Sequence, residues 1–349
     1  NRRTLIVGAA ATAGLAAIPG GFVRGASSAK SSPRRAIAFD DGWRFLRSDV
    51  ERGADPDLDD SSWREVALPH DWSIEDLPGA PRSTAPWVPP VANWTVKRVH
   101  ARPSSIPIPT ASWPDPSPEG PPLRVGPFDP RESAGSWGTG WTVGGVGWYR
   151  KRFMPPPMSK DERLEIRFDG AFCEAEVWIN GKKLGTNVYG YGAFEFDLTE
   201  HLRRDAPNVI AVRVANEGET ARWYSGSGLN RRVWLTATGP VRIAPWGVAV
   251  STPRAESQAA EVLVDVEVEN HFGQEAVAEL HVRILDAKGR TAAKGQSQLS
   301  LDTNAKGKGR VTLQLSRPKL WGPNHPHLYA AEVSVRVNGR ETDRTSTRF

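Results

Sequence analysis

The chain has 349 residues, of which 39% are hydrophobic and 24% are charged, and its formal net charge is +5. This length allows two domains of ordinary size, and the single cysteine, Cys173, excludes both an intramolecular disulfide and a cysteine-based zinc site. The positive charge does not predict a nucleic-acid partner, because much of the excess lies at the N-terminus and no basic stripe interleaved with aromatic residues follows.

Residues 1–29 are typical of an export signal. Arg2 and Arg3 precede an Ala-rich apolar run that glycine and proline interrupt. The arginine pair resembles a twin-arginine signal, so we expect a bacterial protein exported to the periplasm or the medium, with no membrane contact in its mature form. An uncleaved membrane anchor is the alternative, but the run is too short for a span. Cleavage after Ala29 would remove three arginines and lower the net charge from +5 to +2.

Residues 84–122 form a segment rich in Pro, Ser and Trp. Because proline lacks the amide donor, we expect no strand ladder here. A loop of this length is either functional or loosely ordered. Its tryptophans could stack on sugar rings, but we favour a loosely ordered insertion; these are Trp87, Trp94 and Trp113.

The remaining chain predicts short β-strands. Apolar residues alternate along 175–179, 208–216 and 261–270, and Asn-Gly pairs at 180–181 and 338–339 are typical of tight hairpins. No window predicts a helix of four turns. We therefore expect two packed β-sandwiches, with a seam near residues 237–247, where Gly and Pro interrupt the pattern.

Seven motifs occur in an order that resembles glycoside hydrolase family 2, most closely its bacterial β-galactosidase branch. They include "FDDGWRF", "LPHDW", "TVGGVGWYRKRF", "VWINGKKLG" and "RWYSGSG", followed by "PKLWGPNHPHLYAAEVSV". The resemblance implies a galactose-binding-like jelly-roll domain over 37–239, containing the Pro-rich insertion, and an immunoglobulin-like β-sandwich over 240–349. Enzymes of this family catalyse hydrolysis with two glutamates on a (β/α)8 barrel. No βαβα alternation is apparent in this sequence, so we expect no catalytic residue here and no activity of the chain alone.

The resemblance also implies a sugar-binding rim. Arg222 matches the family's arginine in the RWY-glycine corner, and "LPHDW" supplies Asp71 on another loop of the same rim. Both side chains can bond to sugar hydroxyls, so we expect them to contact a terminal galactoside. A structural role is equally open for each: a turn cap for Asp71 and an ion pair for Arg222. Packing at the interface or the pocket rim is expected for four aromatic residues: Trp72, Trp148, Trp223 and Tyr224. For Trp72, Trp148, Tyr149 and Trp223, packing in the core or between domains is favoured over a functional role.

Three other motifs do not predict a catalytic or metal-binding role. Asn216-Glu217 has the spelling of the family's acid/base pair, but it follows a jelly-roll strand, so we interpret Glu217 as a loop residue. His325 and His327 flank a proline and lack a third ligand nearby, so we expect no metal and no cofactor. Cys173 lies in a strand pattern and is expected to be buried and inert.

Three functions remain open at this point. The chain could be the non-catalytic part of a family 2 glycoside hydrolase, a free-standing carbohydrate-binding protein, or a structural pair of sandwiches that contacts other proteins. The pairing of Asp71 with Arg222 at one corner favours the first. Reading the gene beyond Phe349 would separate the first from the second.

Overall fold

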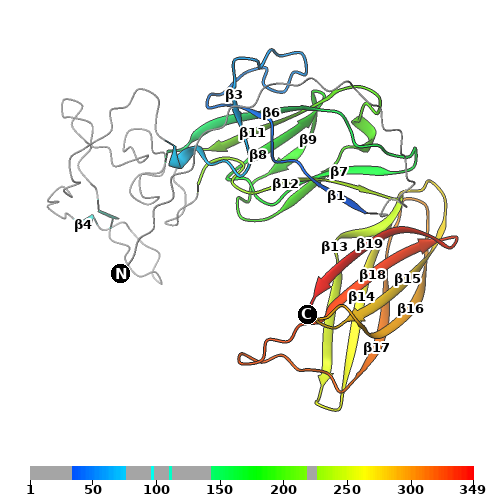
Figure 1. Cartoon of the computed structure of the whole chain (residues 1–349). Helices are drawn as coiled ribbons and strands as arrows, with labels where there is room; N and C mark the ends of the chain where they lie inside the picture. Colours follow the sequence, from blue (N-terminus) through cyan, green and yellow to red (C-terminus); the bar gives the residue numbers. More distant parts are fainter. Residues whose placement is uncertain (1–33, 76–95, 98–109, 112–142, 218–225) are drawn as a thin grey trace, which may run out of the picture. The chain divides into compact units, whose positions relative to one another are not determined.

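The computed structural model describes residues 34–75, 96–97, 110–111, 143–217 and 226–349. Strands dominate the described residues, and every pair of neighbouring strands among them is antiparallel (Figure 1). The strands form a jelly-roll β-sandwich followed by an immunoglobulin-like β-sandwich, which confirms the predicted fold class.

The first sandwich packs a four-stranded sheet against a six-stranded one. The four-stranded sheet has the order β1 (Arg35–Ala38), β12 (Val233–Thr238), β7 (Arg163–Phe168), β10 (Phe194–Asp197). The six-stranded sheet has the order β3 (Arg64–Val66), β2 (Trp43–Leu46), β6 (Gly145–Phe153), β11 (Asn208–Asn216), β8 (Ala175–Ile179), β9 (Lys182–Asn187).

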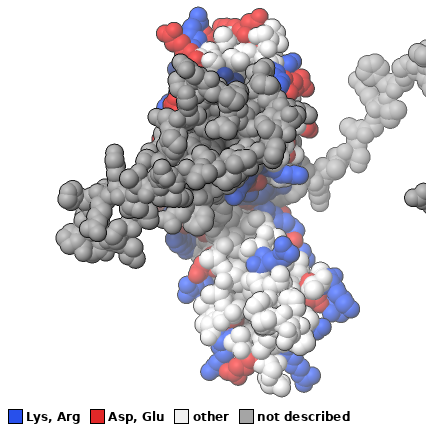
Figure 2. Space-filling model, turned by 90° about the vertical axis from the view of Figure 1, so that its left-hand side faces the viewer, with Lys and Arg blue, Asp and Glu red and all other residues white. Residues whose placement is uncertain are grey.

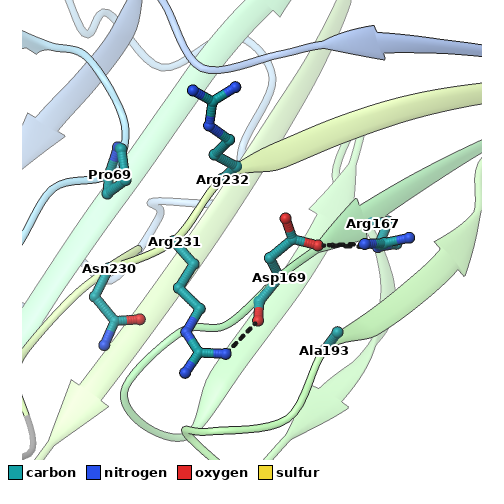
Figure 3. A pocket seen from close by; sticks show the side chains of 7 residues that line it. All are labelled: Pro69, Arg167, Asp169, Ala193, Asn230, Arg231 and Arg232. Atoms are coloured by element: carbon teal, nitrogen blue, oxygen red, sulfur yellow. Dashed lines mark hydrogen bonds and ion pairs between the residues drawn. The ribbon is translucent and has the colours of Figure 1, made fainter. Parts of the chain in front are cut away.

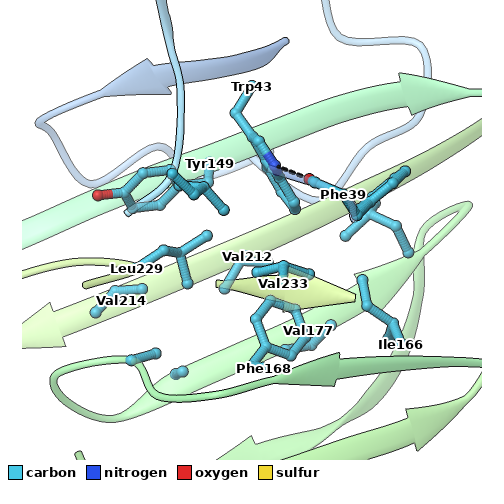
Figure 4. Packing of buried hydrophobic residues seen from close by; sticks show 14 of the residues in the cluster. Phe39, Trp43, Tyr149, Ile166, Phe168, Val177, Val212, Val214, Leu229 and Val233 are labelled. Carbon is cyan, nitrogen blue, oxygen red and sulfur yellow. Dashed lines mark hydrogen bonds between the residues drawn. The ribbon is translucent and has the colours of Figure 1, made fainter. Parts of the chain in front are cut away.

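The core between these two sheets is aromatic and β-branched (Figure 4). Val212 and Val214 of β11 face it, as the alternation in the sequence predicted, and Ile166 and Phe168 of β7 meet them from the other sheet. Trp43 closes one end, where its indole nitrogen donates a 2.8 Å hydrogen bond to the carbonyl of Phe39. The bond satisfies the indole N–H, which allows the whole ring to be buried.

The six-stranded sheet is also buried on its second face. Residues 47–63 run across it and enclose a smaller cluster in which Trp148 stacks on Trp178 at a centroid distance of 5.2 Å. Arg150, fully buried on β6, holds this segment: its Nε donates to a carboxylate oxygen of Asp60 at 2.7 Å. Burial on both faces explains why β11 is apolar almost without interruption and why β6 is buried along most of its length.

The predicted Asn-Gly hairpins are present. Asn180 and Gly181 have φ of 49° and 82° and connect β8 to β9; Asn338 and Gly339, with φ of 52° and 73°, connect β18 to β19. Two consecutive positive φ angles match the twist of antiparallel strands, and Asn and Gly adopt them at the lowest cost.

The second sandwich has a three-stranded and a four-stranded sheet. The first has the order β13 (Val241–Ala255), β14 (Ala259–Asn270), β17 (Lys306–Ser316), and the second has the order β16 (Thr291–Leu301), β15 (Ala276–Leu285), β18 (Ala330–Val337), β19 (Arg340–Arg348). Along β14 the valines point into the core and the acidic residues between them point outward. Pro245 lies where the register of β13 shifts, between Ile243 and Val248.

Only single helical turns occur among the described residues: η1 (Trp72–Ile74) and η3 (Thr199–His201). The expectation of no ladder within residues 84–122 is wrong at one place. There β4 (Val96–Lys97) pairs with β5 (Thr110–Ala111), and none of these four residues is a proline. The three tryptophans of this segment lie outside the described residues.

Charge on the visible face of the second sandwich is mixed, with basic and acidic residues interspersed (Figure 2). The ion pairs of this sandwich include cross-strand pairs such as Arg310 of β17 with Asp265 of β14. Within the described ranges no helix is long and apolar enough to cross a membrane. The same residues contain no group of three or more His, Cys, Asp or Glu side chains that could hold a metal ion.

Candidate functional site

The corner around Asp71 is built from two loops. Asp71 precedes η1 in an extended conformation, and its Oδ1 accepts hydrogen bonds from the Ser73 amide at 2.9 Å and the Ser73 hydroxyl at 2.6 Å. The same oxygen accepts a third bond, at 2.8 Å, from the Ser227 amide. Asp71 therefore caps its own turn, as its structural interpretation predicted, and also ties that turn to the second loop.

The second loop contains Gly226 and Gly228, the two glycines of the "SGSG" sequence. Two backbone hydrogen bonds join the loops. The His70 amide donates to the Leu229 carbonyl, and the Trp72 amide donates to the Ser227 carbonyl. Gly228 has a φ of 128°, and a Cβ there would lie 2.4 Å from the Tyr149 hydroxyl. Only glycine fits this position, because both the backbone angle and the space exclude a side chain.

Asn216 supports the same loop from beneath. It is buried, and its amide nitrogen donates to the Gly226 carbonyl at 3.0 Å and to the Ser227 hydroxyl at 2.8 Å. The Ser227 hydroxyl donates in turn to the Val143 carbonyl at 2.9 Å. Asn216 thus has a structural role, and Glu217 beside it is exposed just after β11, which agrees with its interpretation as a loop residue.

A polar chain runs from buried Tyr149 and His70 to partly exposed Glu75 and Arg64. The His70 Nδ1 lies 2.6 Å from the Tyr149 hydroxyl and its Nε2 lies 2.9 Å from a carboxylate oxygen of Glu75. Arg64 donates to the other oxygen of Glu75 at 2.6 Å. Burial lowers the pKa of His70, although the Glu75 carboxylate acts in the opposite direction, and burial raises the pKa of Tyr149 well above its ordinary range.

These directions keep Tyr149 protonated and favour a neutral His70. In the tautomer that donates from Nε2 to Glu75, the Tyr149 hydroxyl donates to Nδ1; the Arg64 guanidinium lies 3.1 Å from the same Nε2. The chain is a fixed support for the loop that carries Asp71. Sequence reasoning missed His70 and its partners, although the histidine stands next to Asp71 in "LPHDW". Adjacency to the predicted residue was the signal that could have found it.

The predicted aromatic residues lie in two different places. Trp72 is buried next to the corner, stacks on Phe45 at 5.6 Å and donates from its indole nitrogen to the Gly144 carbonyl at 3.0 Å. Trp148 is buried under residues 47–63 and donates to Asp49. Core packing, one of the predicted roles, is thus observed for both, and a role at the rim stays a prediction. Arg222, Trp223 and Tyr224 lie outside the described residues.

Two further expectations concern single residues. Cys173 lies in a bend before β8 rather than in a strand, and it is only partly buried, which corrects the sequence interpretation. Burial still raises the pKa of its thiol to about 11, so it is a poor nucleophile. The rings of His325 and His327 stack at a centroid distance of 6.4 Å.

Two family models and several known proteins match this chain. Residues 139–239 match the model of the sugar-binding domain of glycosyl hydrolases family 2, and residues 241–349 match a second model of the same family. A β-galactosidase from Bacteroides ovatus is 32% identical over 92% of this chain, and a β-glucuronidase assigned as putative, from Formosa agariphila, is 30% identical over 89%.

Solved structures agree. A glycosyl hydrolase family 2 member from Bacteroides cellulosilyticus superimposes with a TM-score of 0.73 and 33% identity over 90% of this chain. The chain spans 32% and 24% of the two relatives and 35% of that structure. These shares correspond to the two β-sandwich domains alone. Because both domains match models of the same family, the chain belongs to glycosyl hydrolase family 2.

Proposed function

We propose that this chain is the sugar-contacting, non-catalytic part of a family 2 glycoside hydrolase of the β-galactosidase type. In this proposal the first sandwich presents Asp71 and Arg222 to the terminal sugar, and a barrel domain supplies the catalytic glutamates. The observation that carries it is the clamp between Asp71 and the Ser227 amide, which fixes a carboxylate at the end of the RWY run. The relative named a β-galactosidase supports the choice of sugar.

The chemistry of the rim follows from how Asp71 is held. Three donors on Oδ1 fix the plane of the carboxylate, so a sugar hydroxyl meets an acceptor that needs little reorganisation. Charge-assisted hydrogen bonds of this kind contribute about 1.5–3 kcal/mol each. Arg222 would donate to neighbouring hydroxyls. The rim thus selects and orients the sugar without taking part in bond cleavage.

Hydrolysis with retention needs two carboxyl groups held about 5 Å apart. The Asn216-Glu217 pair does not provide them, because Asn216 carries an amide, which bonds to the glycine loop, and Glu217 is a single exposed carboxylate. We therefore expect pure chain to leave aryl β-galactosides and aryl β-glucuronides intact. Turnover that is lost on Glu217→Gln would contradict this.

The decisive experiment reads the gene past Phe349 and uses the polypeptide it encodes. If a barrel follows, Asp71→Ala and Arg222→Ala should each lower kcat/KM on an aryl β-galactoside by about ten- to a hundred-fold, mainly through KM. Asp265→Ala, which removes a carboxylate from the second sandwich, is the matched control and should change nothing.

Three outcomes would overturn the proposal. Full efficiency in both variants would make the rim purely structural. A higher kcat/KM on the β-glucuronide than on the β-galactoside would exclude the galactosidase type. A stop codon after Phe349, together with tight galactose binding by the chain in calorimetry, would instead identify a free-standing carbohydrate-binding protein.

The same proposal places the mature protein outside the cytoplasm, exported by its twin-arginine-like signal. Fusing residues 1–36 to a reporter that is active only after export tests this. Changing both Arg2 and Arg3 to Lys should abolish export, because twin-arginine signals depend on that pair. Export that survives the double change would contradict the proposed route.

A further inference from the structure

A shallow depression of about 480 Å³ lies beside the corner, on the first sandwich (Figure 3). It is lined by Pro69, by Asp169 at the end of β7, and by the run from Asn230 to Arg232 that leads into β12. Its volume falls in the range of sites for small molecules.

Positive charge outweighs negative charge in this depression. Three arginines and one aspartate line it, and that aspartate is already engaged: Asp169 accepts two bonds from Arg167, at 3.0 Å and 2.7 Å, and one from the indole of Trp234 at 2.8 Å. The nearest carboxylate to Arg232 is Asp40, at 3.9 Å. The depression therefore attracts an anion.

Arg231 has the least neutralised of these charges. Its Nη1 makes two long bonds to backbone carbonyls, 3.4 Å to Asp169 and 3.3 Å to Tyr191, and its other guanidinium nitrogens have no partner among the described residues. The aliphatic part of the Arg231 side chain lies over Gly170. A Cβ at this glycine would be only 2.8 Å from the Arg231 Cδ. The glycine thus orients a guanidinium whose remaining donors can grip a carboxylate or a sulfate group with two parallel bonds.

Two neighbouring features fit a saccharide better than a bare anion. The Asn230 Oδ1 is buried and has no hydrogen-bond partner in the described part of the chain, which leaves an acceptor for a hydroxyl at the wall. The loop before Ala193 carries Tyr189 and Tyr191, residues that are 64% and 43% exposed and whose ring centroids lie 5.9 Å apart. Exposed aromatic faces next to polar groups are suited to packing against sugar rings.

We propose that this depression is a second carbohydrate site, one that binds an acidic saccharide through its carboxylate or sulfate group. Arg231 holds the anionic group, Asn230 accepts from a hydroxyl, and Tyr189 packs against the sugar ring. The site is distinct from the proposed contact of Asp71 with the terminal sugar, and it needs no catalytic domain to act.

Calorimetry with the 349-residue chain tests the proposal. The probes are methyl β-D-glucuronide for the carboxylate, galactose 6-sulfate for the sulfate, inorganic sulfate for the bare anion and methyl β-D-galactoside as the neutral sugar. At least one acidic sugar should bind at least about tenfold more tightly than the neutral one, and high salt should weaken it. The side-chain amide signal of Asn230 in NMR spectra should shift on binding, which locates the site.

Variants separate the roles of the residues. Arg231→Gln should weaken acidic sugars at least about tenfold, and Arg231→Lys should weaken them less, because a lysine keeps the charge but loses the fork. Arg254→Gln removes the same charge from an exposed pair on β13 and should leave affinity unchanged. Tyr189→Ala should weaken the sugars but not inorganic sulfate. Asp71→Asn keeps an oxygen for the Ser73 and Ser227 amides and should leave this binding intact, so the two sites can fail separately.

Several results would overturn the proposal. Equal affinity for the neutral and the acidic sugars would remove the role of the guanidinium. An equal loss in Arg254→Gln would indicate unspecific attraction to a basic protein. Binding of inorganic sulfate alone would contradict a saccharide site, and no binding of any probe at millimolar concentration would exclude the site.

Discussion

The cores of the two sandwiches are built from different side chains, although each lies between two antiparallel sheets. The core of the first contains many aromatic rings, with Trp43, Trp72 and Tyr149 fully or almost fully buried. The buried residues of the second core are aliphatic, mostly valine, leucine and alanine. Leucines there pack against strand glycines, as Leu280 does against Gly309.

Buried polar groups sharpen this contrast. In the first sandwich, Asp71, His70 and Asn216 hold loops at one corner, and Arg150 holds residues 47–63 over a sheet. The second sandwich has a buried pair, Arg242 of β13 with Glu269 of β14, and forms many of its other ion pairs at the surface, such as Arg283 with Glu332. Buried polar networks cost stability when they are incomplete but fix geometry when they are satisfied. The polar network of the first sandwich therefore fixes the loops at its corner, and the predictions below test that difference.

The largest expected effect is at the glycine corner. Gly228→Ala forces a Cβ against both the Tyr149 hydroxyl and the His70 carbonyl at a φ of 128°, so it should cost about 4–5 kcal/mol or more and unfold the first sandwich. Gly289→Ala is the matched control in the second sandwich: φ is 75° but no atom lies within 4 Å, and about 1 kcal/mol is expected.

Urea unfolding followed by tryptophan fluorescence measures both glycine variants. The buried indoles of Trp43, Trp72 and Trp148 report on the first sandwich, and circular dichroism follows the strands of both. Similar losses in the two variants would show that the corner tolerates a side chain and would remove the steric argument for this loop.

The next effect concerns buried against exposed ion pairs. Asp60→Ala leaves the guanidinium of Arg150 buried without its carboxylate, which should cost about 3–5 kcal/mol in the free energy of unfolding. Asp265→Ala breaks the exposed pair with Arg310 and should change nothing measurable. Equal effects would mean that the buried Arg150–Asp60 pair contributes no more to stability than the exposed Arg310–Asp265 pair.

Asp71 itself gives an intermediate effect. Asp71→Ala removes the acceptor for the amides of Ser73 and Ser227, and leaving these donors unpaired should cost about 1–3 kcal/mol. Asp71→Asn keeps a carbonyl oxygen at that place and should cost less. Denaturant titration of the two variants checks this. If Asp71→Ala were fully stable, the carboxylate would not hold the corner, and its role would be in binding alone.

The extent of sequence prediction follows the same division. The valines of β14 and the two Asn-Gly hairpins were predictable, because alternation and turn chemistry are local properties. Asp71 was found only by family resemblance. The His70–Tyr149 contact joins residues 79 positions apart, and no local pattern encodes it. The short β4–β5 ladder was missed because the prolines around it suggested no pairing.

The smallest effect is a pH dependence that belongs to His70. Burial lowers its pKa in the folded protein below the ordinary value near 6.5, so the unfolded chain binds a proton that the folded chain does not. The sign is therefore fixed: this group makes the first sandwich less stable as the pH falls below about 6.5. His70→Gln removes the titration but keeps polar atoms near Tyr149 and Glu75. Urea midpoints measured from pH 7.5 to pH 5 should fall less steeply in the variant, while all other titrating groups are shared by the two proteins. Parallel curves would mean that His70 is protonated equally in both states, and the neutral bridge between Tyr149 and Glu75 would be wrong.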